Sequence, residues 1–200
     1  DRHAGLGKSV QVGGFTLAGT GDGGNYDLVL PTGLTVDISP ALLVVTASDT
    51  TKVYDGGTSA TSHAVAAAGS TLYHGDTLAG GIFAYADRHA GQGHKTVTVS
   101  GVTVQDGQGG ANYLVSYVDN TTSTITPAPL TVSGLSGVDR VYDGSTDAQV
   151  TGQPVFALLH AGDAVALSQG TASFADRHVG VGKAITLAGY GLTGSESGNY

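Results

Sequence analysis

Apolar and polar positions alternate with a period of two along most of the chain. In residues 95–99, for example, Val97 and Val99 alternate with polar side chains, which is the pattern of a strand with one buried face. The same pattern predicts strands over residues 9–12, 26–30, 34–38, 113–117, 123–125 and 184–187, and short apolar runs after prolines predict two more over 42–45 and 130–132. No segment keeps a helical period of 3.6, so only short helical turns near Ala111 or Phe156 are expected.

One predicted strand changes phase at the same place in three similar segments. Val97 and Val99 share a face, but the next apolar positions are Val102 and Val104, with Gly101 before them. An odd shift turns the side chains to the opposite face, and glycine permits the bulge or bend that this needs. Gly14 and Gly189 hold the equivalent places. We predict one long strand that bends or passes from one sheet to another; the alternative is two short strands joined by a tight turn.

The chain also repeats itself. Asp-Arg-His followed by Ala or Val and then Gly begins at Asp1, Asp87 and Asp176, and Val-Tyr-Asp-Gly occurs 88 positions apart at Val53 and Val141. Asn-Tyr recurs every 87 positions, at Asn25, Asn112 and Asn199. A fixed period predicts an array of like modules.

The repeat phase divides the chain into three parts. We expect residues 1–40 to be the C-terminal part of a module, 41–128 a complete module, and 129–200 a module lacking its last strands. The joints at 38–41 and 125–129 contain Pro40, Pro127 and Pro129, and proline keeps a short connector stiff and extended. The expected fold is all-β, with tandem small immunoglobulin-like β-sandwiches of about 88 residues.

Composition agrees with a β-protein and excludes several classes of function. Among 200 residues there are 33 glycines, 12% charged residues and no cysteine, so a disulfide scaffold and a thiolate metal site are excluded. The formal net charge is −8 with only eight Lys and Arg, which argues against nucleic acid or an anionic membrane surface as a partner. No apolar run approaches the roughly 20 residues that span a bilayer, so no membrane insertion is expected.

Two repeated motifs are predicted to be structural. Asp-Gly is a strong turn signal, and a tyrosine before it can pack its ring on the core and direct its hydroxyl to a backbone partner. These turn residues are Tyr54, Asp55, Gly56, Tyr142, Asp143 and Gly144. The second motif forms the loop between two strands, with Asp87, Arg88, His89 and Gly91 in one copy and Asp176, Arg177, His178 and Gly180 in another. A recognition surface is the alternative for this loop; no nucleophile or further metal ligand recurs with it.

Two weaker signals compete with ordinary turns. The Gly- and Asp-rich segments 21–27 and 106–112 resemble calcium turns, but the third copy, 194–198, keeps a single acid, whereas calcium needs several converging carboxylates. Ordinary turn chemistry is therefore favoured over calcium, and no cofactor is expected. Asn120-Thr121-Thr122 is one isolated glycosylation triplet.

The spaced motifs together carry a resemblance. Lys-Val-Tyr-Asp-Gly, then Gly-Asp at residues 75–76 and 162–163, then the Asp-Arg-His loop, then Asn-Tyr and Ile-Ser/Thr-Pro-Ala resemble the YDG-type repeat of bacterial surface proteins similar to filamentous haemagglutinins, often exported by two-partner secretion. The resemblance implies an exported adhesin or biofilm-matrix protein at the bacterial cell surface, associated with the outer membrane. It also extends to mucin-binding repeats, which implies a β-grasp-like module as the alternative fold.

The expected function is non-enzymatic. Repeat modules in contact with their neighbours would act as a semi-rigid stalk or spacer in adhesion or biofilm, where many weak contacts in series raise avidity. The alternative is a carbohydrate- or mucin-binding module for extracellular polysaccharide or host glycan, with an exposed aromatic platform drawn from Tyr73, Tyr85, Tyr117 and Tyr190. Because an incomplete third module would expose strand edges, and exposed edges recruit partners, head-to-tail self-association of this fragment by strand complementation is also expected.

Overall fold

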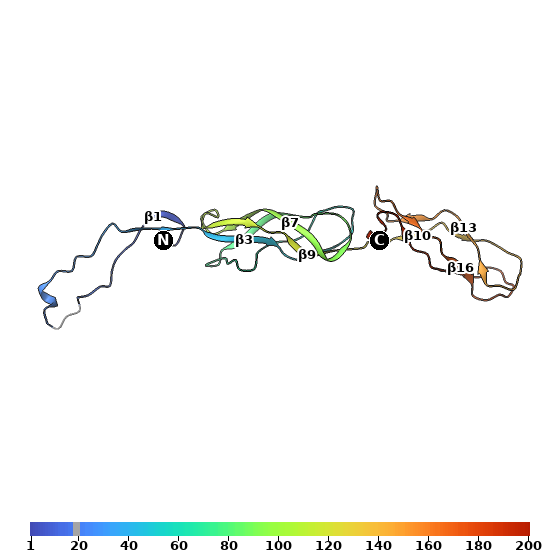
Figure 1. Cartoon of the computed structure of the whole chain (residues 1–200), viewed down its shortest axis with the longest axis horizontal. Helices are drawn as coiled ribbons and strands as arrows, with labels where there is room; N and C mark the ends of the chain where they lie inside the picture. The colour runs from blue at the N-terminus through green and yellow to red at the C-terminus, as the bar shows by residue number, and fades with distance from the viewer. Residues whose placement is uncertain (18–20) are drawn as a thin grey trace. The chain divides into compact units, whose positions relative to one another are not determined.

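A computed structural model describes residues 1–17 and 21–200, and strands form nearly all of its regular structure (Figure 1). The only other elements in the described residues are two 3-10 turns, η1 at Gly23–Asn25 and η2 at Ser197–Asn199. The prediction of an all-β chain is confirmed. The choice between a sandwich and a β-grasp-like arrangement for each module stays a prediction.

The chain divides into two compact units whose boundaries differ from those of the sequence repeats. One unit contains Asp1–Ala47, His63–Ile82 and Val99–Val118, and the other contains Ser48–Ser62, Phe83–Thr98 and Asp119–Tyr200. The long strands β6 (Thr77–Tyr85) and β7 (Gly91–Gln105) each contribute residues to both units. The boundary therefore runs through the middle repeat, away from the proline-containing joints.

The first unit contains two small sheets. Strand β1 (Gly5–Ser9) pairs antiparallel with β2 (Thr35–Ile38). A second sheet has the order β5-β3-β8, in which β3 (Ala41–Ala47) pairs antiparallel with β5 (Ala64–Ala66) and parallel with β8 (Tyr113–Tyr117). The side chains of Leu43 and Val45 on β3 are fully buried, as the alternating pattern requires.

The second unit contains part of a four-stranded sheet with the order β4-β9-β7-β6. Strand β4 (Thr51–Val53) pairs parallel with β9 (Asn120–Thr126), and β9 pairs antiparallel with β7, where Gly91 lies opposite Ile125. Ile125 and Val97 are fully buried. This sheet provides the platform from which the loop between β6 and β7 projects.

From residue 129 onward the second unit contains only short antiparallel pairs. These are β10 (Thr131–Ser133) with β14 (Val155–Ala157), β11 (Ser136–Gly137) with β13 (Val150–Thr151), β12 (Asp147–Ala148) with β16 (Thr171–Phe174), β16 with β17 (Ile185–Ala188), and β15 (Ala166–Leu167) with β18 (Leu192–Thr193). In the described chain, every buried apolar side chain lies between Leu43 and Ala128. Asn199 is the one buried residue of the third repeat.

The predicted strand bend takes different forms in the repeats. In the middle repeat β7 is continuous across Gly101, which has a φ of 65°. Val97 belongs to the second unit and Val102 to the first, so the change of phase accompanies the passage of the strand between units. In the third repeat Gly189, with a φ of 72°, lies between the separate strands β17 and β18. Gly14, with a φ of 76°, lies outside the described strands.

Candidate functional site

The Asp-Arg-His loop of the middle repeat is shaped by its own first residue. The Oδ1 atom of Asp87 accepts a 2.9 Å hydrogen bond from the backbone N–H of His89 and a second bond from the ammonium of Lys95. Lys95 is buried although charged. The hydrogen bond from Lys95 is the largest cause of the lowered pKa of Asp87, so this carboxyl stays ionised as a partner for the buried ammonium.

The other two loops are closed in the same way. The carboxylates of Asp1 and Asp176 accept hydrogen bonds from the backbone N–H groups of His3 and His178, at 3.0 and 2.8 Å. Lys8 pairs with Asp1, and Lys183 pairs with Asp176. Since the aspartate and the lysine hold the loop, the arginine, the histidine and the next backbone N–H are free to face outward.

Gly91 allows the lysine to lie across the loop. A Cβ at this position would come within 2.8 Å of the Lys95 Cδ, and at Gly180 within 3.3 Å of the Lys183 Cδ. The first distance is closer than carbon atoms tolerate. Gly91 therefore leaves space for the aliphatic part of Lys95, which closes the middle loop, whereas a Cβ at Gly5 would be 3.7 Å from the Lys8 Cδ, an ordinary contact.

The outward face of the middle loop contacts the next repeat through a buried asparagine. The backbone N–H of Ala90 donates a 2.9 Å hydrogen bond to the side-chain oxygen of Asn199. The Asn199 side-chain amide donates to Glu196 at 2.7 Å, and the Asn199 backbone carbonyl accepts from the N–H of Ala128 at 2.8 Å. Asn199 is only 3% exposed. One residue of the third repeat is thus bonded both to the loop and to the connector between the repeats.

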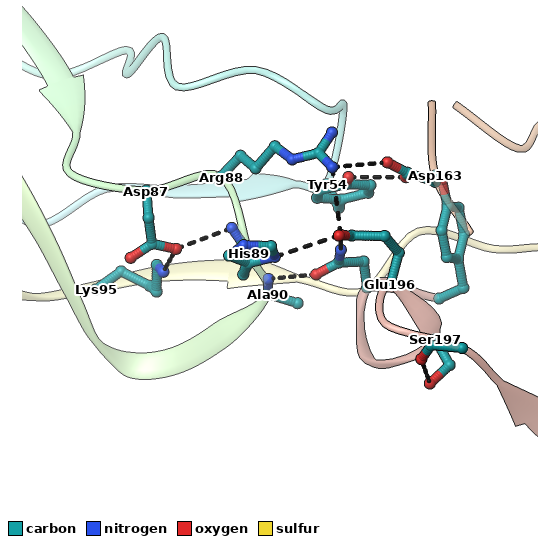
Figure 2. Close-up of polar contacts among 12 residues, drawn as sticks. Tyr54, Asp87, Arg88, His89, Ala90, Lys95, Asp163, Glu196 and Ser197 are labelled. Atoms are coloured by element: carbon teal, nitrogen blue, oxygen red, sulfur yellow. Dashed lines mark hydrogen bonds and ion pairs between the residues drawn. The ribbon is translucent and has the colours of Figure 1, made fainter. Parts of the chain in front are cut away.

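The charged side chains of the same loop face two acids of the third repeat. Figure 2 shows Arg88 and His89 directed toward Asp163 and Glu196. The Arg88 Nη2 lies 3.0 Å from Asp163 Oδ1 and 3.4 Å from Glu196 Oε2, and the His89 Nδ1 lies 3.4 Å from the same Glu196 oxygen. Asp163 Oδ1 accepts no aligned hydrogen bond in the described structure. The interaction between this oxygen and the Arg88 guanidinium is therefore mainly electrostatic.

Two tyrosines complete the contacts of Asp163. The hydroxyls of Tyr54 and Tyr200 donate to Asp163 Oδ2 at 2.8 and 2.5 Å. Their rings meet edge to face with centroids 5.5 Å apart, and Tyr54 meets the His160 ring in the same way at 5.3 Å. The backbone N–H of His160 donates to the Tyr200 hydroxyl at 2.9 Å. The cluster therefore combines aromatic packing with a network in which each hydroxyl has a partner.

The pKa values of this cluster follow from its burial and hydrogen bonding. Burial, and then the hydrogen bond to Asp163, raises the pKa of Tyr54 to about 12, and the same two causes raise the pKa of Tyr200. Burial alone would raise the pKa of Asp163, but hydrogen bonds from Tyr200 and Tyr54 and the charge of Arg88 outweigh it and lower that pKa. The network is therefore most stable with neutral phenols around an ionised carboxylate.

The first unit contains the same junction one repeat earlier. The N–H of Ala4 donates to the side-chain oxygen of Asn112 at 2.7 Å, and the carbonyl of Asn112 accepts from the N–H of Ala41 at 2.9 Å. The Tyr113 hydroxyl donates to Asp76 at 2.7 Å, and Arg2 lies 3.8 Å from the same carboxylate. We call this arrangement the junction: an Asp-Arg-His loop bonded to the Gly-Asp and Asn-Tyr residues of the following repeat.

A comparison with protein families agrees with the repeated motifs. The YDG domain matches residues 39–123 and 126–200. This chain belongs to the YDG-domain family. No curated protein and no solved structure matches it. In the described residues of these YDG repeats, no helix is long and apolar enough to cross a membrane.

The turn that gives the YDG domain its motif forms as predicted locally, but its tyrosines differ. Asp55 Oδ1 accepts from the N–H of Gly57 at 2.9 Å, and Gly56 has a φ of 75°. Tyr54 is buried and its hydroxyl bonds a carboxylate of the next repeat, so the expected backbone partner was wrong. Tyr142 is 59% exposed. The equivalent turn there has Asp143 Oδ1 accepting from the Ser145 N–H at 2.9 Å, and Gly144 has a φ of 81°.

The segment that resembles a calcium turn is organised by one buried carboxylate. Asp106 accepts hydrogen bonds from the backbone N–H groups of Gln108, Gly110 and Asn112, at 2.8, 2.8 and 3.0 Å. Burial would raise the pKa of Asp106, but these three bonds lower it to about 2. The turn thereby positions Asn112 for the junction. Within the described residues, no three His, Cys, Asp or Glu side chains gather as a metal site.

The tyrosines proposed as a ligand platform lie in different environments. Tyr73 is 53% exposed and Tyr117 is 43% exposed, while Tyr190 is half-buried. The prediction is wrong for Tyr85, which is buried and whose hydroxyl donates to the carbonyl of Thr124 at 2.9 Å. Tyr85 lies on β6 with its ring turned into the sheet, so it serves packing.

Sequence reasoning missed the partners of the loop. Asp163, Glu196 and Asn199 were not among the candidate site residues, although Gly-Asp and Asn-Tyr recur with the same period as the Asp-Arg-His loop. A shared period is the signal that the three motifs belong to one recurring contact. The structure brings the loop motif and the turn tyrosine Tyr54 together with them.

Proposed function

We propose that this chain is a non-enzymatic repeat segment of a secreted or cell-surface bacterial adhesin, of the filamentous-haemagglutinin-like kind exported by two-partner secretion. Its repeats act as a semi-rigid stalk or spacer in adhesion or in a biofilm matrix. Membership of the YDG-domain family supports this role. The observation that carries it is the junction, which occurs twice with the same bonds, at Ala4–Asn112 and Ala90–Asn199.

The junction restrains the connector as well as the loop. In each copy the asparagine binds the loop with its side chain and the alanine after the connecting proline with its backbone, as in Asn112 with Ala41 and Asn199 with Ala128. Two attachments on opposite sides of one residue limit rotation about the short connector. A spacer needs this resistance to bending, because a flexible chain of the same length spans a much shorter distance on average.

Distance measurements by electron spin resonance test the stiffness. The chain has no cysteine, so labels at Thr58→Cys and Gln169→Cys, both exposed in the middle and third repeats, are unique. We expect a narrow distance distribution, broadened by Asn199→Ala. Asn25→Ala, which changes the equivalent but exposed asparagine, is the matched control and should leave the distribution narrow. A broad distribution in the otherwise unchanged chain would contradict a stiff spacer.

Localisation tests the adhesin role separately. Antibodies raised against this chain should label intact cells of the source bacterium and the material they release. Deleting the gene should lower attachment or biofilm mass. Signal confined to the interior of lysed cells, with attachment unchanged, would overturn the proposal.

A second candidate function is glycan binding at exposed tyrosines. It is favoured by Tyr73 and Tyr117, whose rings are accessible to solvent and could stack on sugars. A glycan array with the full chain, compared with Tyr73→Ala and Tyr117→Ala, tests it. Signal that both substitutions abolish would support binding; absence of signal at high protein concentration leaves the spacer role.

A further inference from the structure

The first and last parts of the middle repeat run in the same direction. Strand β3 pairs in parallel with β8, with Ala41 opposite Tyr113. Strand β4, which follows β3 in the chain, pairs in parallel with β9, with Val53 opposite Thr126. One of these parallel pairs lies in each compact unit. The strands that open the repeat are therefore bonded, in parallel, to the strands that close it.

Hydrogen bonds close both parallel pairs at each end. Four backbone bonds of 2.8–3.0 Å do so, with N–H donor and carbonyl acceptor in the order Ala41 to Asn112, Val118 to Val45, Thr124 to Thr50 and Tyr54 to Thr126. Asp49, in the segment between β3 and β4, also accepts side-chain hydrogen bonds from Asn120 at 2.7 Å and from Thr122 at 2.5 Å. The bond from Ala41 belongs to the junction, so the first ladder begins where the connector from the preceding repeat ends.

Tension along the chain would enter this repeat at the start of β3 and leave it at the end of β9, because the chain continues on both sides. In a parallel pair, the start of one strand and the end of its partner lie at opposite ends of the ladder. Pulling on these two points slides the strands past each other and loads the evenly spaced hydrogen bonds together. In an antiparallel pair the same two points lie at one end, where the bonds break one after another. The parallel pairing is therefore the arrangement in which extension requires several bonds to break at once.

We propose that the middle repeat is a mechanical clamp, in which the β3–β8 and β4–β9 pairs resist extension of the chain under tension. This function goes beyond the spacer role, which concerns bending at the connectors and not the unfolding of a repeat. Resistance to force depends on the rate of unfolding. The clamp slows this rate because the bonds of a whole ladder must break together. The repeat therefore stays folded, and keeps its length, while the chain is pulled.

Single-molecule force spectroscopy on the full chain tests the clamp by comparing two directions of pulling. The chain has no cysteine, so pairs of introduced cysteines at exposed positions define where the force is applied. Ser39→Cys with Thr131→Cys pulls along the chain, whereas Ser39→Cys with Gln108→Cys pulls the starts of β3 and β8 apart. At one loading rate, the first pair should unfold at about twice the force of the second or more, because its bonds are loaded together. Equal forces, or a higher force for the second pair, would overturn the inference.

Two proline variants separate the clamp from general stability. Val118→Pro removes the N–H that bonds the Val45 carbonyl across the β3–β8 pair. Ala67→Pro is the matched control, because it removes an N–H that bonds the Val44 carbonyl at 2.9 Å on the other side of β3, outside the parallel pairs. Both variants should lower the midpoint of urea unfolding. Only Val118→Pro should raise the unfolding rate under force along the chain, by about fivefold or more.

Equal effects of the two variants on the unfolding rate under force would contradict the clamp. The comparison of pulling directions needs neither proline, so it decides the inference even where a variant does not fold. Failure of the clamp would leave the spacer proposal unaffected, because the spin-label distances measure bending in the folded chain.

Discussion

The backbone N–H of Ala90 is bonded to the side chain of Asn199, 109 positions further along the chain, and the N–H of Ala4 is bonded to Asn112 in the same way 108 positions away. The contact skips the loop's own repeat and reaches the next one. Because each asparagine also binds the connector between the two repeats, these bonds determine how neighbouring repeats are held together.

Replacing Asn199 should weaken the second junction selectively. Asn199→Ala removes the acceptor for Ala90, and leaving a half-buried donor unpaired costs about 1–3 kcal/mol. We expect a lower free energy of unfolding and faster amide exchange at Ala90, measured by nuclear magnetic resonance. The amide of Ala4, in the other junction, serves as the internal control and should keep its protection. Unchanged exchange at Ala90 would argue against the bond.

The two tyrosines of the YDG turns should respond differently to loss of their hydroxyls. Tyr54→Phe removes a hydrogen bond to an ionised carboxylate, for which about 1.5–3 kcal/mol of stability is expected. Tyr142→Phe changes a tyrosine that is 59% exposed, and its effect should stay within about 0.5 kcal/mol. Urea denaturation of both variants checks this. Equal losses would contradict a special role for the Tyr54–Asp163 contact.

Alkaline titration should reveal the same contact. The pKa of Tyr54 is raised to about 12, against about 10 for a free phenol. A raised pKa gives a contribution to stability that is complete below about pH 10 and is lost as the pH rises through the folded-state value. Phenolate absorbance should therefore show a late step near pH 12, and its amplitude should fall by one tyrosine in Tyr54→Phe, because the pKa of Tyr200 is also raised. If the amplitude of the late step is unchanged in that variant, the assignment is wrong.

The loss of unfolding free energy at low pH should depend on Asp106. Its pKa is lowered to about 2, compared with about 3.9 in an unfolded chain. A lowered pKa contributes stability above the unfolded value, which is lost as the pH falls toward about 2. Asp106→Asn should flatten the decline of unfolding free energy between about pH 4 and pH 2. Asp119→Asn, which removes an exposed carboxylate, controls for the change in net charge.

The bend in β7 should require glycine. Gly101 has a φ of 65°, and a Cβ added to this residue would have no heavy atom within 4 Å. Gly101→Ala should therefore cost about 1–2 kcal/mol through backbone strain alone. Gly13→Ala is the matched control, because Gly13 also has free space but no positive φ. Thermal unfolding that ranks the two variants equally would contradict this account.

Several elements that depend on local pattern could be predicted from the sequence, although the strand predicted over 26–30 does not form and β1 ends at Ser9, at the start of the strand predicted over 9–12. The alternation around Val97 and Val99, the Asp-Gly turn at Asp55 and the glycine at Gly101 each reflect preferences of a few neighbouring residues. The partners of the loop could not be predicted in the same way. A period assigns Asn112 and Asn199 the same phase, so it does not say whether the loop at Ala90 meets the asparagine of its own repeat or that of the next.

Every repeat that carries the Asp-Arg-His loop with its following N–H also has, elsewhere in its sequence, the Asn-Tyr turn that receives such a loop. Any repeat can therefore precede any other without a new interface having to arise. Recombination within the gene that adds or removes one period leaves the new neighbours matched, as Ala4 is to Asn112 and Ala90 to Asn199. The number of repeats can then change while the connection between consecutive repeats stays the same.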